Sequence, residues 1–297
     1  MHLIELEHKH FLVEKFERAV VTSSYQNNWC DRTTEVKTIH IHSWAEFLDQ
    51  VSQLDQWAFR GQPRADLPLL SSLSRRLMRF PGNQQLWPLL ERRSLRIFRR
   101  KAHVHVTDPN LLQNDLRCLA MMQHHGSATR LLDFTKSPFV AAFFALESAY
   151  NDSVVYALNT PVLWHRVPRF DASLTRHTID PRVPQNFEKY FFNNHLPLIW
   201  FGEPSEMDQR LSAQSGLFVV PGQLEKTLDE LLTSYSVEGE SLLVQLVLDK
   251  SVRLKAMKEL YRMNITYASL WPDIDGLSRS MNQELEIIWQ PLVDEFL

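Results

Sequence analysis

This 297-residue chain is poor in cysteine and glycine, and it contains no hydrophobic run long enough to cross a bilayer, which takes about 20 apolar residues. Its two cysteines, Cys30 and Cys118, fit neither a disulfide framework nor a zinc motif. Eight glycines are too few for a repeat or a collagen-like chain. The first residues, MHLIELEHKHFLVEKF, mix acids into the apolar positions, unlike a signal peptide. We therefore expect a globular, cytoplasmic protein without a membrane partner.

The net charge of −3 conceals a basic block between residues 60 and 101. This block holds eleven Arg and Lys residues against only Asp66 and Glu91. A local excess of this sign can face the phosphates of a nucleic acid or of a dinucleotide. Four of the arginines also recur at helical spacing, as a solvated helix face would have them: Arg92, Arg96, Arg99 and Arg100. Both interpretations of the block stay open on the residues alone.

Hydrophobic periodicity predicts an alternation of helices and strands with no internal repeat. Helices are predicted over 3–20, 43–54, 84–101, 110–125, 138–149 and 254–263. Strands are predicted over 34–42, 57–60, 153–158, 215–220 and 241–248. The last of these is almost continuously apolar, which favours an interior strand. Residues 160–204, rich in Pro and Asn, are expected to form a loop with short helical pieces, and the whole predicts an α+β fold.

Capping residues mark several of the predicted helix ends. Ser43, Asn110 and Ser137 are placed to begin helices, because their side chains accept hydrogen bonds from the first turn. Pro138 follows Ser137 at the first helical position, where a missing N–H is tolerated. Gly126 stands just past a helix end, where positive φ is common.

The segment QHHGSATRLLDFTKSP, residues 123–138, concentrates hydrogen-bonding groups between two apolar helices. We interpret Arg130, Asp133 and Thr135 as alternating along a short extended segment, so that they face one side and the Arg pairs with the Asp. Buried polar groups must be paired or reach solvent. The cluster is therefore either a rigid internal network or the floor of a pocket, and the residues alone do not choose between the two.

Metal and nucleophile motifs are weak throughout the chain. Pairs of potential ligands occur without the spacing of a recognised metal site: His40 and His42, His103 and His105, His124 and His125, Asp273 and Asp275. No G-x-S-x-G turn occurs, and Cys118 falls inside a predicted helix as a small buried residue. We expect no metal site.

Several blocks resemble the FRG-domain family. Phe59-Arg60-Gly61 supplies its name-giving motif, followed by Gln62. The other blocks follow in the family's order and span roughly residues 57–280: QHHGSATRLLDFT (123–135) with PFVAAFFA after it, RLSAQSGLF (210–218) and NITYASLWPDIDGL (264–277). Phe134 stands where the family commonly has Trp, and Ala128 where Pro is frequent. We expect a helical and strand extension at 1–42 and a single FRG domain at 43–297.

The arrangement is also similar to the ADP-ribosyltransferase plan, which implies a split, mostly antiparallel sheet flanked by helices. In that plan an Arg on a first strand grips NAD, a Ser/Thr-rich strand runs into a short buried helix, and a late strand carries Glu. Arg60, and Thr129 to Thr135 followed by PFVAAFFAL, resemble the first two parts. The resemblance implies NAD as substrate.

The same resemblance supplies the candidate site residues. The catalytic candidates are Arg60, Thr135, Gln214 and Glu284. The candidates for contact with NAD are Arg60, Gly61, Gln62, His124, Thr129, Arg130 and Asp133.

The identity of the catalytic acid stays open. Gln214 occupies the corresponding block but is neutral, so it can hold a ribose hydroxyl and stabilises a cation poorly. Glu284 belongs to a Glu-Leu-Glu sequence with the expected letters, although its apolar neighbours are spaced as a helix face, which favours a structural helix. Asp133 is a further candidate acid.

The implied function is ADP-ribosyl transfer or NAD cleavage in a bacterial defence or toxin-like role. The basic block at 60–101 would then meet a macromolecular target, either protein or nucleic acid. Enzymatic activity itself is left open, because the neutral Gln214 also suits a sensor or interaction protein that binds a nucleotide without turnover. A nucleic-acid-binding module is the other alternative.

Overall fold

The computed structural model describes residues 36–79, 82–106, 108–236, 239–289 and 293. The chain divides into two units, Met1–Thr33 and Thr34–Leu297, and all described residues belong to the second. The helix predicted over 3–20 and Cys30 lie outside the described residues. The unit boundary lies ahead of the domain start expected at residue 43, because the strand before it belongs to the same sheet as the rest of the domain.

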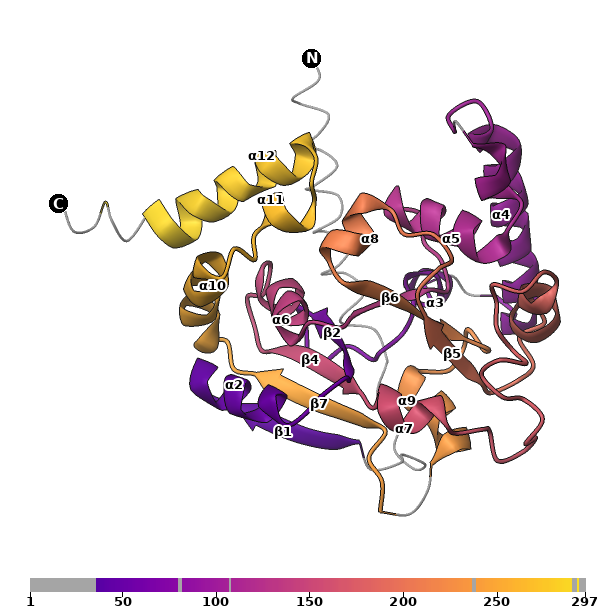
Figure 1. Ribbon diagram of the computed structural model, residues 1–297, viewed down its shortest axis with the longest axis horizontal. Helices are drawn as coiled ribbons and strands as arrows, with labels where there is room; N and C mark the ends of the chain where they lie inside the picture. Colours follow the sequence, from indigo (N-terminus) through magenta and orange to yellow (C-terminus); the bar gives the residue numbers. More distant parts are fainter. Residues whose placement is uncertain (1–35, 80–81, 107, 237–238, 290–292, 294–297) are drawn as a thin grey trace. The chain divides into compact units, whose positions relative to one another are not determined.

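The described strands form a single mixed sheet (Figure 1). They are β1 (Lys37–Ile41), β2 (Ala58–Gln62), β3 (Leu132–Thr135), β4 (Ser153–Leu158), β5 (Ile199–Gly202), β6 (Gly216–Pro221) and β7 (Leu243–Leu248). Their order in space is β1-β7-β4-β2-β3-β6-β5. The pair β1–β7 is parallel and every other pair is antiparallel. The α+β class and the mostly antiparallel sheet are thus confirmed.

The expectation of a split sheet needs correction, because the strands are continuous from β1 to β5. The connection between β2 and β3 is nevertheless narrow. It consists of one residue pair, Phe59 opposite Thr135, whereas β2 pairs with β4 along five residues. Beyond Phe59 the two strands separate, and backbone groups that a regular ladder would satisfy must find other partners. We call this place the β2–β3 seam.

The described helices surround the sheet. The α-helices are α2 (Trp44–Ser52), α3 (Ser72–Leu77), α4 (Trp87–Ala102), α5 (Asp115–His124), α6 (Pro138–Leu146), α7 (Thr160–Trp164), α8 (Gln209–Ala213), α9 (Leu228–Leu232), α10 (Val252–Arg262), α11 (Tyr267–Leu270) and α12 (Ile274–Gln283). Short 3₁₀ turns are η1 (Gln84–Leu86), η2 (Pro109–Leu112) and η4 (Thr233–Tyr235). Two segments are π-helical, η3 (Phe187–Phe192) and η5 (Glu284–Trp289).

Most predicted caps are present. The Ser43 hydroxyl accepts from the Glu46 N–H at 3.2 Å, and the Ser137 hydroxyl accepts from the Val140 N–H at 3.3 Å. Gly126 has φ of +83°. Asn110 does not begin α5, since it lies inside the η2 turn, and Asn114 caps that helix instead.

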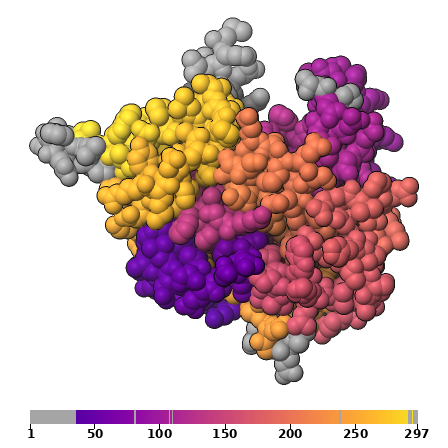
Figure 2. Space-filling view, in the orientation of Figure 1, coloured from indigo at the N-terminus to yellow at the C-terminus, as the bar shows by residue number. Residues whose placement is uncertain are grey.

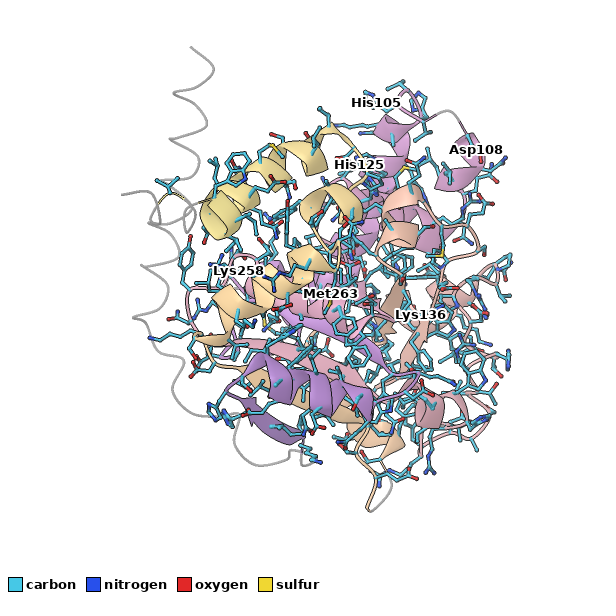
Figure 3. All side chains as sticks on the ribbon, turned by 60° about the vertical axis from the view of Figure 1, so that its left-hand side comes forward. His105, Asp108, His125, Lys136, Lys258 and Met263 are labelled. Atoms are coloured by element: carbon cyan, nitrogen blue, oxygen red, sulfur yellow. The ribbon has the colours of Figure 1, made fainter. Side chains whose placement is uncertain are left out.

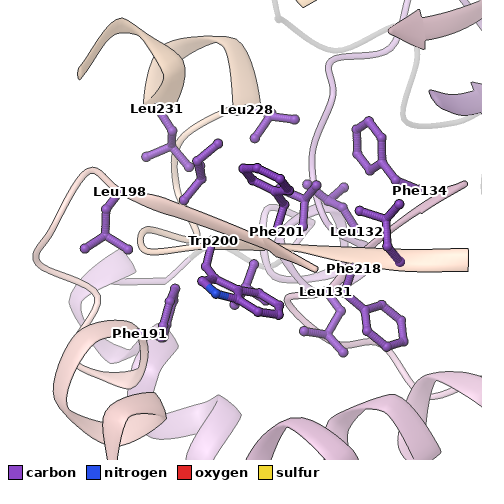
Figure 4. Close-up of a cluster of buried hydrophobic side chains, with 14 of the residues drawn as sticks. Leu131, Leu132, Phe134, Phe191, Leu198, Trp200, Phe201, Phe218, Leu228 and Leu231 are labelled. Atoms are coloured by element: carbon purple, nitrogen blue, oxygen red, sulfur yellow. The ribbon is translucent and has the colours of Figure 1, made fainter. Parts of the chain in front are cut away.

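A hydrophobic core lies on each face of the sheet. Neighbouring residues of β4 alternate between them, Tyr156 on one side and Val155 on the other. Figure 4 shows part of the first core, where Trp200 of β5 lies among apolar side chains from several elements. Strand β5 was missed because it is hidden in the Pro- and Asn-rich segment 160–204. Helix α6, predicted to be apolar nearly all round, packs in the second core.

Among the helices of the described ranges, none combines the length and the apolar character needed to cross a membrane.

Candidate functional site

A cleft of about 590 Å³ lies beside the β2–β3 seam. This volume falls within the usual range for small-molecule sites, roughly 300–1,000 Å³. Its walls come from β2, the end of α5, β3, α6 and the segment that carries α8 and the start of β6. In Figure 2 the orange segment that contains α8 adjoins the yellow C-terminal helices on the face in view. We call this hollow the seam cleft.

Arg60 lies on β2 at the edge of the seam cleft. One of its terminal nitrogens donates to the backbone oxygen of Asp133 at 2.6 Å, so the guanidinium bridges the gap that opens past Phe59. Its Nε is buried and has no hydrogen-bond partner among the described residues. Burial lowers the pKa of this guanidinium, while the nearby Asp133 carboxylate raises it. Arg60 therefore closes the seam and places its positive charge at the cleft, while its Nε stays shielded from solvent.

Asp133 presents its carboxylate to the seam cleft from the exposed side of β3. One oxygen accepts a hydrogen bond from Gln123 Nε2 at 2.6 Å. The carbonyl of Gln123 accepts in turn from the hydroxyl of the buried Thr129. Thr129 thus lies behind the cleft wall and orients Gln123, which holds the carboxylate in place.

Thr135 and Gln214 are brought together at one end of the cleft. The Thr135 hydroxyl donates to the Gln214 backbone oxygen at 2.7 Å and accepts from the Ser137 N–H at 3.0 Å. The Gln214 side-chain amide donates to the Leu270 oxygen at 3.1 Å. Both residues line the cleft, although the hydroxyl of Thr135 is already occupied by the backbone.

Four further charged groups of the cleft were not singled out from the sequence: Arg117, Glu206, Asp208 and Arg210. Arg117 pairs with Glu206 at 2.5 Å, and Asp208 lies 3.0 Å from Nδ1 of His124. Arg210 donates to the His124 oxygen at 3.3 Å and lies 5.0 Å from the ring centroid of Trp271. Burial lowers the pKa of Arg210, and Asp133 counteracts that effect. The sequence signal that could have identified Arg210 as a cleft residue was its position at the start of the block RLSAQSGLF.

The charges of the cleft fall into two groups. Arg117 and His124 have acidic partners. Across the part of the chain that the structure describes, Arg60, Arg210 and Asp133 have no ion pair within 4.0 Å, although both arginines are close enough to Asp133 to interact with it electrostatically. These three side chains face a common space and together carry a charge of +1, while Asp208, which also acts on Arg210, adds a negative charge beside them. Such a space is suited to a ligand that carries both an anionic and a polar or cationic centre.

The predicted pairing of Arg130 with Asp133 is wrong. The two residues are three positions apart, and an odd separation places side chains on opposite faces of an extended segment. Arg130 is fully buried, where it pairs with Glu91 and donates to the oxygens of Phe191 and Pro221 at 2.8 and 3.0 Å. It has no place in the cleft lining.

Gly61 and Gln62 have structural surroundings. A Cβ on Gly61 would overlap the backbone of Ala141 and Ala145, so the glycine permits the close approach of α6 to β2. Gln62 is buried, and its amide donates to the oxygens of Arg64 and Leu67 at 2.9 and 2.8 Å. Gly61 borders the cleft through its backbone, whereas Gln62 does not line it.

Glu284 begins the π-helical segment η5 and lies outside the cleft lining. The Glu-Leu-Glu sequence is therefore helical, as the spacing of its apolar neighbours indicated, and not part of a strand. Asp133 is the only one of the acids considered from the sequence that lines the seam cleft.

The basic block at 60–101 does not form one surface. Arg60 lies in the seam cleft, Arg92 pairs with Glu188 and Arg99 pairs with Asp115. The exposed basic residues of α4 are Arg93, Arg96, Arg100 and Lys101. Figure 2 shows the purple α4 region standing apart from the yellow C-terminal helices.

The sequence offers pairs of histidines as potential metal ligands, among them His124 and His125. Figure 3 labels His125, which lies just past the end of α5 near the start of the polar segment 123–138, and Lys136, which lies just past β3 near its end. Within the described ranges, no group of three or more His, Cys, Asp or Glu side chains is arranged to hold a metal ion.

Residues 55–153 match the model of the FRG domain. The match includes the Phe59-Arg60-Gly61 motif and the whole of segment 123–138, and it supports the FRG-domain family for this part of the chain. It therefore covers β2, β3 and α6, the elements that meet at the seam, while the quoted blocks 210–218 and 264–277 lie outside it. No curated protein matches the chain, and no solved structure does.

Proposed function

We propose that the seam cleft binds a nucleotide, with NAD as the substrate, and that it supports ADP-ribosyl transfer or NAD cleavage. The observation that carries this proposal is a set of three charged groups that form no ion pair with any described residue, Arg60, Arg210 and Asp133, facing one cleft of about 590 Å³. The likeness to the ADP-ribosyltransferase plan supports it further, since Arg60 stands on a strand and β3 leads directly into the buried helix α6.

The two arginines are suited to the diphosphate. A guanidinium forms charge-assisted hydrogen bonds with phosphate oxygens and keeps its charge at neutral pH even when burial lowers its pKa. Among the described residues Arg60 lines the cleft without an ion pair, and Arg210 makes one 3.3 Å hydrogen bond to a backbone oxygen. Both can therefore accept a new anionic partner without breaking an ion pair.

Asp133 is suited to the sugar that carries the reacting bond. When the bond between the ribose C1′ and the nicotinamide nitrogen breaks, the electron pair leaves with nicotinamide and the ribose becomes cationic. A fixed carboxylate stabilises such a cation electrostatically. Water or a target nucleophile then bonds to C1′ and loses a proton. Gln123 holds the Asp133 carboxylate by its 2.6 Å hydrogen bond, and Gln214 can contact a ribose hydroxyl.

The test is a calorimetric titration of the full chain with NAD, in which nicotinamide release is followed in the same sample. Binding with release supports the enzyme. Binding without release supports a nucleotide sensor, and no binding overturns the proposal. Arg210→Gln should weaken NAD binding at least tenfold, while Arg262→Gln, an exposed arginine outside the cleft, should leave it unchanged. Arg60 is less informative because it also bridges the seam.

A second candidate function rests on α4. Arg93, Arg96 and Arg100 share one exposed side of the helix, and no ion pair holds them in the described structure. Such a row can contact the phosphates of a nucleic acid. A labelled duplex titrated at two salt concentrations tests it, with Arg93, Arg96 and Arg100 all replaced by Gln. A loss of duplex affinity and of salt dependence in the triple variant would support the nucleic-acid module. Equally weak binding by the unchanged chain and the triple variant would dismiss it. Arg99 is left intact because it pairs with Asp115.

The proposed NAD consumption would suit a toxin-like or defence role, in which the exposed side of α4 meets the macromolecular target. The NAD titration and the duplex titration address these two surfaces separately.

A further inference from the structure

A second, smaller pocket lies between the end of α6 and helices α10, α11 and α12, which are neighbours in Figure 1. Its volume is about 190 Å³, and it shares no lining residue with the seam cleft. This is about a third of the volume of the seam cleft, so the pocket suits a small metabolite better than a nucleotide. We call it the α10–α12 pocket.

Gln283 is the unusual residue of this pocket. Its side chain is only 6% exposed, and neither its Nε2 nor its Oε1 has a hydrogen-bond partner in the described part of the chain. A buried amide normally has its hydrogen bonds satisfied, and an unpartnered one is costly. Gln283 lines the pocket, and a ligand that reaches its two buried amide atoms would supply both a hydrogen-bond donor and an acceptor.

The charged residues of the pocket leave one cation and one anion uncompensated. Arg253 pairs with Glu286 at 2.7 Å and also donates to two backbone oxygens. Glu147 accepts a hydrogen bond from the Tyr267 hydroxyl, and the exposed Arg279 lies over the rings of Tyr267 and Trp271. Considering the described residues alone, neither Glu147 nor Arg279 has an ion pair within 4.0 Å, and they do not pair with each other.

Tyr267 lies between these two charges. Its pKa is raised by burial and by Glu147 and lowered by Arg279, so its hydroxyl keeps its proton at neutral pH. The hydroxyl is therefore fixed as a donor to Glu147, and it orients the carboxylate without neutralising it.

We propose that the α10–α12 pocket binds a small zwitterion of the class of free α-amino acids. The ligand carboxylate meets Arg279 and the Gln283 Nε2, and the ligand ammonium meets Glu147 and the Gln283 Oε1. This arrangement satisfies the unpaired cation, the unpaired anion and both amide atoms at once. A ligand with a single charge leaves one of the two protein charges unpaired, and a phosphate ester brings more negative charge than the pocket compensates.

The experiment is a thermal unfolding screen of the full chain with each of the standard L-amino acids, followed by calorimetry on those that stabilise it. Acetate and methylamine serve as probes that carry only one of the two charges. We expect at least one amino acid to bind, and to do so more than tenfold more tightly than either probe. No stabilisation by any amino acid, or equal binding of acetate or methylamine, would overturn the proposal.

Variants separate a ligand site from a packing defect. Glu147→Gln and Arg279→Gln should each weaken amino-acid binding more than tenfold, and Arg262→Gln, outside the pocket, should not change it. Gln283→Met removes the unpartnered atoms, so it should raise the unfolding midpoint of the ligand-free protein and abolish binding. A lowered midpoint would contradict the assignment of Gln283. NAD turnover is expected to be the same in Glu147→Gln and Gln283→Met, which lie outside the seam cleft, so this proposal and the proposed function fail independently.

Discussion

Arg130 and Arg60 were both predicted to hold NAD, yet the structure gives them opposite surroundings. Arg130 is fully buried, and its guanidinium donates to a carboxylate and to two backbone oxygens. Arg60 makes one hydrogen bond, leaves its Nε without a partner in the described structure, and borders a cleft. The two arginines therefore differ in their hydrogen bonding: all three nitrogens of the Arg130 guanidinium donate to an acceptor, whereas the Nε of Arg60 has no acceptor among the described residues.

The difference shows how the polar segment 123–138 serves two purposes. Where a buried polar group is fully satisfied, as at Arg130, it joins distant parts of the fold. Where charge is left without an ion pair at a cleft, as at Asp133 across the described residues, it is available to a ligand. Both alternatives left open by the sequence, an internal network and a pocket floor, are therefore present, the first just before β3 at Arg130 and the second on β3 at Asp133.

The largest expected effect follows from breaking the network. Arg130→Met leaves Glu91 buried without its partner, which typically costs about 3–5 kcal/mol in the free energy of unfolding. Chemical denaturation measures it. Arg92→Met is the matched control on a neighbouring arginine, because its ion pair with Glu188 is more exposed and should cost at most about 1 kcal/mol. Equal losses of unfolding free energy in Arg130→Met and Arg92→Met would contradict the distinction between a buried network and an exposed ion pair.

A second prediction concerns the cleft side of the strand. Asp133→Asn should cost at most about 1 kcal/mol in the free energy of unfolding, because the exposed carboxylate loses only its interactions with Arg60 and Arg210. If the carboxylate stabilises a cationic sugar, nicotinamide release should fall roughly 10²–10³-fold, the range seen when one transition-state contact is removed. Asp275→Asn, exposed on α12 outside the cleft, is the control. Undiminished release by Asp133→Asn would remove this residue from the reaction.

Gly61→Ala tests the packing that positions Arg60. The added methyl group meets backbone atoms of α6, which cannot rotate away as a side chain can. Overpacking of this kind costs about 1–3 kcal/mol, or more where no relaxation is available. Thermal unfolding measures the loss, and an unchanged midpoint would show that α6 is free to shift from β2.

The smallest effect is expected at Glu284. Since this residue lies in η5 outside the cleft lining, Glu284→Gln should leave NAD binding and nicotinamide release unchanged. The kinetic assay used for Asp133→Asn decides between the two acids. A loss of turnover in Glu284→Gln with normal binding would favour Glu284 over Asp133 as the catalytic acid.

Local features of the fold were readable from the sequence because local chemistry determines them. Ser137 and Pro138 begin α6, and Gly126 takes positive φ, as their residue types indicate. The apolar strand at 243–248 lies inside the sheet, as its composition predicts. Alternation also placed Arg60 at the side of β2 that reaches a cleft.

The remaining features depend on contacts between distant residues. The partner of Arg130 lies 39 positions earlier in α4, and no local pattern connects the two. The need for Gly61 arises from the approach of α6, and the role of Arg210 from the position of α8 across the cleft. The direction of Arg130 was nevertheless available from counting, since it stands three positions before Asp133 and an odd separation places the two side chains on opposite faces.

The central claim is that the seam cleft is where the ligand binds, and hydrogen–deuterium exchange with and without NAD tests it most directly. We predict slower exchange upon NAD binding in peptides that cover 58–62, 123–135 and 208–216, with no change over α4 at 87–102. Unchanged exchange at the seam, or protection confined to α4, would contradict this account of the site.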